Sequence, residues 1–171
     1  MEFQVGDKLV YPSQGVTVVE EVGEEELAGQ MFRCYHLRLL STNSKVMVPV
    51  KNSDRVGLRR LSDAGEVAAV MARLRDSGGQ DEHDWKDRYR ANLDRIKTGD
   101  LNEIVDVLLC LAEVASRKTL SFRERKMFDH ARQLLVYEVA EVEGRDVDEV
   151  SQEVDGIIRE RAGNILDDED E

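Results

Sequence analysis

The spacing of apolar residues changes near residues 61–62, and this change constrains the fold more than any other feature of the chain. Before it, apolar and polar residues alternate along short runs, as they do over 31–40. After it, apolar residues recur at helical spacing, first at Val67, Val70, Met71 and Leu74. Alternation is typical of β-strands, and a spacing of three and four residues is typical of amphipathic helices. The sequence therefore predicts an α+β protein with a β domain over 1–61 and a helical domain over 62–163.

Five short strands are predicted within the β domain, over 3–11, 16–19, 31–40, 45–50 and 56–60. Turn-forming residues at 12–15 and 41–44 separate some of them, and the acidic run 24–26 predicts a loop between the second strand and the third. Short, strongly bent strands in this number favour a small β-barrel of the SH3 or Tudor type.

Helix-breaking residues at 77–79, 98–99 and 144 divide the helical domain. The segments 100–103 and 121–124 have the form of capping boxes, in which the first and fourth residues each bond the other's backbone with a side chain. Such signals mark where helices begin. We therefore expect a compact all-α bundle of about five helices.

Charge is distributed unevenly along the chain. The formal net charge is −12, yet residues 1–62 hold eight basic and eight acidic side chains. Beyond them, two basic islands interrupt the acidic sequence: 85–97 carries a net +3, and 117–132 carries a net +4. The acidic segment 164–171 is expected to be disordered. An acidic chain is unsuited to coating nucleic acid, but a local basic surface can still bind phosphates.

Several classes of protein are disfavoured. The sequence contains neither a secretion signal nor an apolar run that could span a membrane, so we expect a cytoplasmic protein. Cys34 and Cys110 lie within apolar patterns and have no second ligand at metal-binding spacing, so we expect buried thiols. No histidine stands in a recognisable catalytic arrangement, and there is no glycine-rich phosphate loop. We expect neither an enzyme nor a bound metal or cofactor.

The only tryptophan, Trp85, stands at the head of the first basic island. On a helix over 84–97, one stripe holds Trp85, Tyr89, Leu93 and Ile96, and a neighbouring stripe holds Lys86, Arg90 and Lys97. One interpretation is that the aromatic stripe packs on the bundle and the basic stripe is solvated. The other is that the indole protrudes at the helix N-terminus, where phosphate is also favoured, and presses on bases while the cations hold the backbone.

The second island collects cations at a corner between two predicted helices. Arg117 and Lys118 end one helix, and Arg123 and Lys126 begin the next. Cations at the end of a helix commonly complement its dipole. With a second basic segment in the same domain, they also fit a surface that follows a phosphate backbone.

Three segments carry a resemblance to a known family. They are 5–16 (VGDKLVYPSQGV), 85–90 (WKDRYR) followed by 97–100 (KTGD), and 120–127 (LSFRERKM). In these segments and their order, the chain resembles the CarD/CdnL family of bacterial transcription regulators. The resemblance implies a Tudor-like N-terminal domain that docks on the RNA polymerase β subunit by strand pairing. It also implies a helical domain that contacts promoter DNA at the upstream edge of the transcription bubble.

The resemblance also assigns roles to single residues. A tryptophan matching Trp85 presses into the minor groove and helps to keep the strands apart, and matching basic residues contact the DNA backbone. The predicted DNA-binding residues, including further cations of the two islands, are Trp85, Lys86, Arg88, Arg90, Lys97, Arg123 and Lys126. The predicted polymerase-binding residues are Leu27, Met47 and Pro49. Two positions depart from the family pattern: Asp87 stands where relatives often have a basic residue, and Glu25 where some have an arginine.

The resemblance and the residues together predict a monomeric transcription activator. It would stabilise the promoter open complex, with contacts to DNA that are mostly not sequence-specific, and it would reach the nucleoid through polymerase. The alternative is a protein-interaction adaptor that is anchored on polymerase and binds another regulator through its acidic helical domain, with little or no DNA contact.

Overall fold

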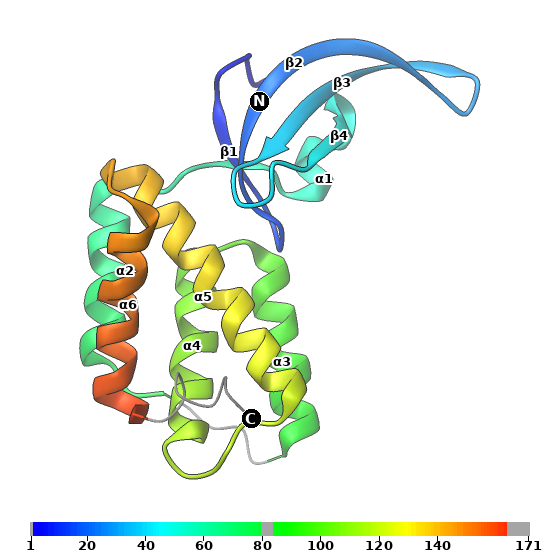
Figure 1. Cartoon of the computed structure of the whole chain (residues 1–171). Helices are drawn as coiled ribbons and strands as arrows, with labels where there is room; N and C mark the ends of the chain where they lie inside the picture. Colours follow the sequence, from blue (N-terminus) through cyan, green and yellow to red (C-terminus); the bar gives the residue numbers. More distant parts are fainter. Residues whose placement is uncertain (1, 80–83, 164–171) are drawn as a thin grey trace. The chain divides into compact units, whose positions relative to one another are not determined.

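The computed structural model describes residues 2–79 and 84–163. The chain forms two compact units, Met1–Leu61 and Ser62–Glu171, each with its own hydrophobic core. The first unit is built on strands and the second on helices, so the fold is α+β as predicted (Figure 1). The predicted disorder of 164–171 lies outside the described residues.

One antiparallel sheet forms the N-terminal unit, with the strand order β4-β3-β2-β1-β5. Its strands are β1 (Lys8–Tyr11), β2 (Gly15–Leu27), β3 (Gln30–Leu39), β4 (Lys45–Pro49) and β5 (Arg59–Arg60). Leu9, Val19, Tyr35, Leu37 and Val48 belong to the core of this unit. The Tyr35 hydroxyl accepts a hydrogen bond of 3.0 Å from the Phe3 backbone, which holds the N-terminal segment on the core.

The predicted closed barrel is wrong, because β4 and β5 are opposite edges of the sheet and do not pair within the described residues. Between them the chain forms a 3₁₀ turn, Val50–Asn52, and the short helix α1, Ser53–Val56. Gly57 then takes a left-handed conformation with φ of 87°, stabilised by bonds from its N–H to the carbonyls of Ser53 and Asp54. The strand predicted over 56–60 is thereby reduced to two residues, too few to close a barrel.

The hairpin of β2 and β3 is longer than predicted, because residues 24–26 are strand and not loop. Glu24 lies opposite Arg33, Glu25 opposite Phe32 and Glu26 opposite Met31. Continuous pairing with β3 holds these residues in a strand despite the poor strand propensity of glutamate. The connection is a two-residue turn in which Ala28 and Gly29 both have positive φ, 52° and 79°.

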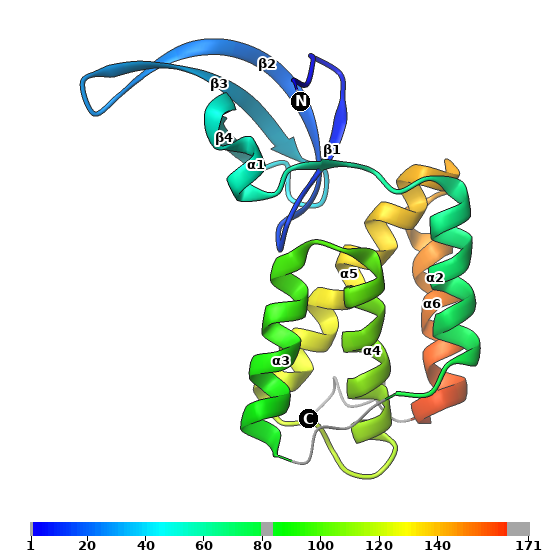
Figure 2. The ribbon, with the colours of Figure 1, turned by 180° about the vertical axis from the view of Figure 1, so that it is seen from behind.

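Five helices form the second unit: α2 (Ala64–Asp76), α3 (Trp85–Thr98), α4 (Leu101–Ala115), α5 (Phe122–Glu143) and α6 (Val147–Ala162). About five helices were predicted for this unit; the short helix α1 in the first unit was not predicted and brings the described residues to six α-helices. Ten of the fifteen residues of α4 are buried, and α4 contacts α2, α3, α5 and α6. Seen from behind in Figure 2, α4 lies between α2 and α3. None of the described helices is both long and apolar enough to cross a membrane.

The two predicted capping boxes are formed only in part. Asp100 caps α4 by accepting from the Asn102 N–H at 2.7 Å, and Ser121 caps α5 by accepting from the Glu124 N–H at 3.2 Å. The carboxylates expected to bond back point elsewhere, because Glu103 lies near Arg95 and Glu124 bonds Arg88. Both arginines belong to α3, so the starts of α4 and α5 also anchor that helix.

Candidate nucleic-acid interface

The buried face of α3 is mostly polar. Arg88, Asn92 and Ile96 are its buried residues, whereas Tyr89 and Leu93 are only partly buried against the core. Trp85 is 47% exposed. The interpretation in which Trp85 packs on the bundle with the rest of its stripe is therefore wrong for the indole itself, which begins the helix at the solvent.

A buried ion pair joins the start of α3 to the start of α5. The Arg88 guanidinium donates from Nε to Glu124 Oε2 at 2.7 Å and from Nη2 to Glu124 Oε1 at 2.9 Å. The two side chains are only 2% and 4% exposed. The prediction that Arg88 contacts DNA is wrong, because its charge is neutralised and shielded from any phosphate. This partnership spans 36 residues and leaves no local signal in the sequence.

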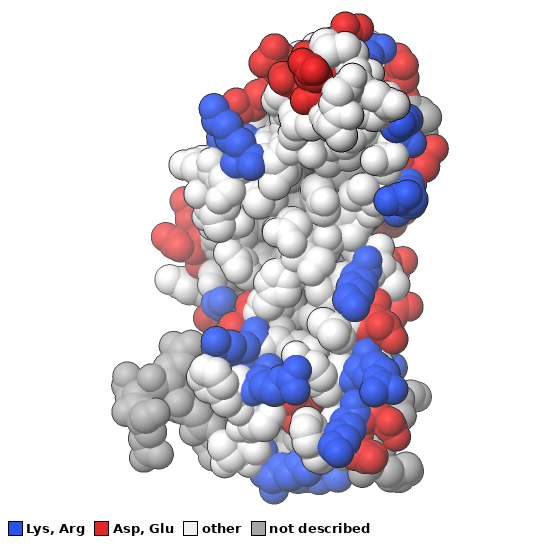
Figure 3. All heavy atoms as spheres, turned by 90° about the vertical axis from the view of Figure 1, so that its right-hand side faces the viewer, with Lys and Arg blue, Asp and Glu red and all other residues white. Residues whose placement is uncertain are grey.

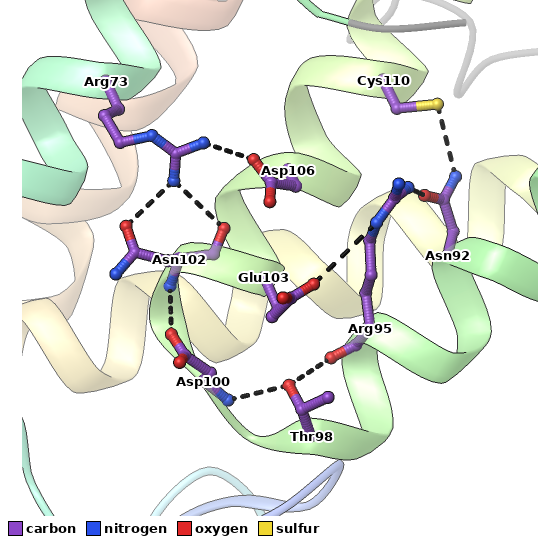
Figure 4. Close-up of polar contacts among 9 residues, drawn as sticks. All are labelled: Arg73, Asn92, Arg95, Thr98, Asp100, Asn102, Glu103, Asp106 and Cys110. Atoms are coloured by element: carbon purple, nitrogen blue, oxygen red, sulfur yellow. Dashed lines mark hydrogen bonds and ion pairs between the residues drawn. The ribbon is translucent and has the colours of Figure 1, made fainter. Parts of the chain in front are cut away.

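The other end of α3 is also held by polar contacts (Figure 4). Asn92 Nδ2 donates to Cys110 Sγ at 3.5 Å, and Arg95 Nη1 donates to Asn92 Oδ1 at 2.6 Å. The Thr98 hydroxyl donates to the Arg95 carbonyl at 2.7 Å and accepts from the Asp100 N–H at 3.2 Å. These bonds fix the corner between α3 and α4.

Two aromatic side chains are exposed at the end of the unit where α3 and α5 begin. Trp85 is one, and Phe122, the first residue of α5, is the other at 74% exposure. Because Arg88 and Glu124 join these two helix starts, both aromatics lie at the same end of the bundle. Sequence reasoning treated Phe122 only as part of a helix-start segment. Its signal was an apolar residue directly after the cap Ser121, out of step with the buried positions Glu124, Met127, Phe128 and Ala131.

Cations surround these aromatics. The Arg123 guanidinium lies over the Tyr89 ring, 4.3 Å from its centroid, and the Lys126 ammonium lies over the Phe122 ring at 4.6 Å. Lys86 and Arg90 are exposed on neighbouring turns of α3. In the lower part of Figure 3, Lys and Arg side chains gather over this side of the helical unit. We call the set the α3–α5 surface; it consists of Trp85, Lys86, Arg90, Phe122, Arg123 and Lys126.

Other predicted cations lie elsewhere or are engaged. Lys97 is exposed in the last turn of α3, about 18 Å along the helix from Trp85. Three cations of the second island face carboxylates of their own unit. These pairs are Arg117 with Glu113 at 3.9 Å, Arg125 with Asp129 at 3.6 Å, and Arg132 with Asp155 at 2.5 Å. The second island therefore contributes chiefly Arg123 and Lys126 to the α3–α5 surface.

The N-terminus of α3 does not offer the phosphate site that its dipole suggested. The Asp84 side chain caps it by accepting from the Lys86 N–H at 3.0 Å, and Asp87 is exposed in the first turn. Both carboxylates complement the helix dipole and repel a phosphate at that point. Any backbone contact on the α3–α5 surface must therefore come from side-chain cations.

The predicted polymerase-binding residues share one face of the N-terminal sheet. Met47 lies opposite His36, and Pro49 lies opposite Cys34, on the face turned away from the core residues Tyr35 and Leu37. Met47 is 40% exposed on β4, an edge strand with a free side. Leu27 belongs to the same face but lies at the tip of the hairpin.

Glu25, one of the two departures from the family pattern, is engaged within this face. Its Oε1 lies 3.2 Å from His36 Nε2. Burial, and secondarily the charge of Glu25, raises the pKa of the Cys34 thiol. Cys34 is thus a buried, protonated thiol and not a reactive one.

A pocket of about 250 Å³ lies between α2, α3 and α4; its lining residues are Arg73, Gly78, Gly79, Arg95, Asp106 and Leu109. Arg73 bonds Asn102 and Asp106, so the Asp106 carboxylate of this lining is held in an ion pair (Figure 4). Among its described lining residues there is no serine, cysteine or histidine that could act as a nucleophile or base. The described residues also contain no cluster of three His, Cys, Asp or Glu side chains suited to a metal.

Comparisons with known proteins cover both units. Residues 3–62 match the family model "CarD-like/TRCF RID domain", and residues 69–155 match "CarD, C-terminal domain". "Putative transcription factor YdeB" of Bacillus subtilis is 30% identical over 142 residues, which cover 83% of this chain and 93% of that protein. The solution structure of the 72-residue N-terminal domain of Myxococcus xanthus CarD is 36% identical. It covers 34% of this chain and 79% of that one, with a TM-score of 0.31.

Proposed function

Since the chain belongs to the CarD family of transcription factors, we propose that it is a transcription regulator that binds RNA polymerase through its N-terminal unit and promoter DNA through the α3–α5 surface. In this proposal the polymerase contact is with the β subunit, and Trp85 acts as a wedge at the upstream edge of the transcription bubble. The observation that carries the proposal is the exposure of Trp85 among unburied cations.

The α3–α5 surface has the chemistry that a DNA wedge requires. Trp85 and Phe122 present flat apolar groups, and inserting such groups between base steps stabilises unstacked DNA. Lys86, Arg90 and Lys126 supply positive charge for the backbone without reading base edges. A protein of this kind raises the population of the open complex and takes its promoter specificity from polymerase.

The N-terminal sheet has the features that strand pairing requires. β4 is an edge strand, so its unpaired backbone groups can extend the sheet with a strand of another protein. Met47 and Pro49 lie on β4 itself, and Met47 presents an exposed apolar side chain beside the pairing edge. Glu25 lies beside His36 on the same face, with its Oε1 3.2 Å from His36 Nε2.

The decisive experiment is the lifetime of the open complex formed by purified polymerase on a promoter, measured without the protein, with it, and with Trp85→Ala. We expect the native chain to lengthen the lifetime and Trp85→Ala to lose most of that effect while polymerase binding persists. Val5→Ala is the matched control, because it removes another exposed apolar side chain, 63% exposed, in the N-terminal unit. A native chain that binds polymerase but leaves the lifetime unchanged would refute the DNA-wedge proposal.

A second candidate function is the polymerase-anchored adaptor. Asp84 and Asp87 favour it, because they place two carboxylates beside Trp85 where a DNA phosphate would be repelled. The adaptor predicts that polymerase binding persists, that the open complex is unaffected, and that Trp85 crosslinks to a protein and not to promoter DNA.

A further inference from the structure

Arg88 is a large charged side chain that is buried although the residues just before it in α3 are exposed. The proposed contact of Trp85 with DNA gives no reason for a buried arginine at this position. Apolar contact holds this end of the helix only weakly, because Tyr89 and Leu93 are partly buried against the core and no apolar residue before Ile96 is fully buried. Residues 85–87 are all exposed, and the buried positions that follow are Arg88, Asn92 and Ile96. Only Ile96, near the other end, is apolar.

The ion pair supplies the missing constraint, and it is directional. Two parallel N–H···O bonds of 2.7 Å and 2.9 Å fix both the distance and the rotation of the guanidinium relative to the carboxylate. Apolar burial does not set direction in this way. Both partners are also held by their backbones. The Glu124 N–H donates to the side chain of the cap Ser121, and the Arg88 N–H donates to the Asp84 carbonyl at 2.9 Å.

These bonds form a continuous connection from the cap of α5 to the first turn of α3. Trp85 lies within that turn, between Asp84 and Arg88. Rotation of the turn would redirect the indole. Tyr89, the residue after Arg88, lies beneath Arg123 of α5, so the same junction also arranges cations of the α3–α5 surface.

We propose that Arg88 and Glu124 are positioning residues: their buried, two-bond ion pair fixes the first turn of α3 on α5 and thereby sets the direction in which Trp85 projects. The pair contacts neither partner and acts through Trp85. A role of the ion pair in transcription rests on the proposed function. Its effect on the direction of Trp85 is a property of the free protein and can be measured without polymerase or DNA.

Because Trp85 is the only tryptophan, its fluorescence tests this proposal in the full chain. Arg88→Lys keeps the charge but cannot form the fork of two bonds. We expect lower steady-state anisotropy and stronger acrylamide quenching of Trp85, limited to about twofold because the residue is already 47% exposed. Arg132→Lys is the matched control, since Arg132 forms a similar fork with Asp155 at 2.5 Å and 2.8 Å between α5 and α6.

If Arg88→Lys unfolds the helical unit, the double variant Arg88→Met with Glu124→Leu tests the proposal instead. Replacing both partners of a buried pair by apolar residues commonly preserves folding. We expect it to retain helical circular dichroism but to show the same loss of anisotropy. Native quenching and anisotropy in a folded Arg88 variant, or an equal change in Arg132→Lys, would overturn the proposal.

Open-complex lifetime separates this proposal from the function on which it rests. With positioning and wedge both right, Arg88→Lys shortens the lifetime toward that of Trp85→Ala, without weakening polymerase binding. A change in Trp85 fluorescence with no effect of the native protein on open complexes would refute the wedge and leave the positioning role standing.

Discussion

Arg88 and Trp85, one turn apart on α3, have the reverse of their usual environments. The guanidinium is buried, and the indole is 47% exposed. Burial of a charge is tolerated only where a partner neutralises it, and an exposed aromatic group beside a second one adds to an apolar patch that can bind a partner. Glu124 neutralises the buried Arg88, and the same ion pair holds the helix turn from which Trp85 projects. At the scale of single residues, the evidence for function is therefore the buried Arg88 together with the exposed Trp85.

The hairpin turn at Ala28 carries backbone strain that a single substitution should relieve. Ala28 has φ of 52°, a left-handed conformation that costs a non-glycine residue about 1–2 kcal/mol, and asparagine tolerates it better. We expect Ala28→Asn to raise the free energy of unfolding of the N-terminal unit by about 0.5–1 kcal/mol. Hydrogen–deuterium exchange of the β2 and β3 backbone amides, which belong to this unit, measures the change.

Gly29→Ala tests the same turn in the opposite direction. Gly29 has φ of 79°, and a Cβ added there would meet nothing within 4 Å, so the substitution changes backbone strain alone. It should lower stability while Ala28→Asn raises it. Equal effects of the two variants would show that φ at this turn does not limit stability.

Which residues are exposed at the site was only partly predictable from the sequence. Trp85, Lys86, Arg90, Arg123 and Lys126 were identified from their charge and position. Arg88 was misassigned, because the basic island and the family resemblance select a residue by its type, while burial of an arginine depends on a partner distant in the chain. Phe122 was not selected either, because whether an apolar residue is covered depends on how other helices pack around it, which the local sequence does not show.

At the scale of elements, starts and ends of helices were predictable because they are local. Asp100, Ser121, Gly99 and Gly144 act through bonds or dihedral angles within a few residues. Closure of the barrel was not predictable in this way, since it depends on whether β5 reaches β4. The acidic residues 24–26 indicated a loop, yet cross-strand partners hold them in β2.

The segment after α2 lies tightly against α4, and a pair of adjacent glycines tests that packing. A Cβ on Gly79 would overlap the Leu109 carbonyl oxygen and lie 2.7 Å from the carbonyl carbon, and α4 backbone cannot yield easily. We expect Gly79→Ala to destabilise the helical unit by about 1–3 kcal/mol. Urea unfolding followed by Trp85 fluorescence reports on this unit.

Gly78→Ala is the control, because a Cβ at Gly78 would meet nothing within 4 Å. It should be neutral or stabilise the unit by about 0.4–1 kcal/mol through the unfolded state. Similar losses in both variants would mean that chain flexibility, and not contact with α4, requires glycine at these positions.

At the scale of the whole molecule, two separate cores carry two separate surfaces on one chain. An acidic protein with few free cations should bind DNA weakly by itself. In the proposed function, anchoring on polymerase would raise the local concentration of the α3–α5 surface at the promoter, typically to the millimolar range for a short connection. The overall charge of −12 is consistent with that proposal, because it disfavours DNA binding away from polymerase.

This dependence predicts that variants of the two units will not be additive. Met47→Glu places a charge on the exposed apolar side chain of β4 and should weaken polymerase binding about tenfold or more. Met31→Glu is its control, because Met31 is 61% exposed on the opposite face of the hairpin. At a concentration where Met47→Glu no longer occupies polymerase, adding Trp85→Ala should not shorten the open-complex lifetime further. Since independent sites give additive free energies, an undiminished effect of Trp85→Ala in the Met47→Glu background would mean that the helical unit acts on DNA without its anchor.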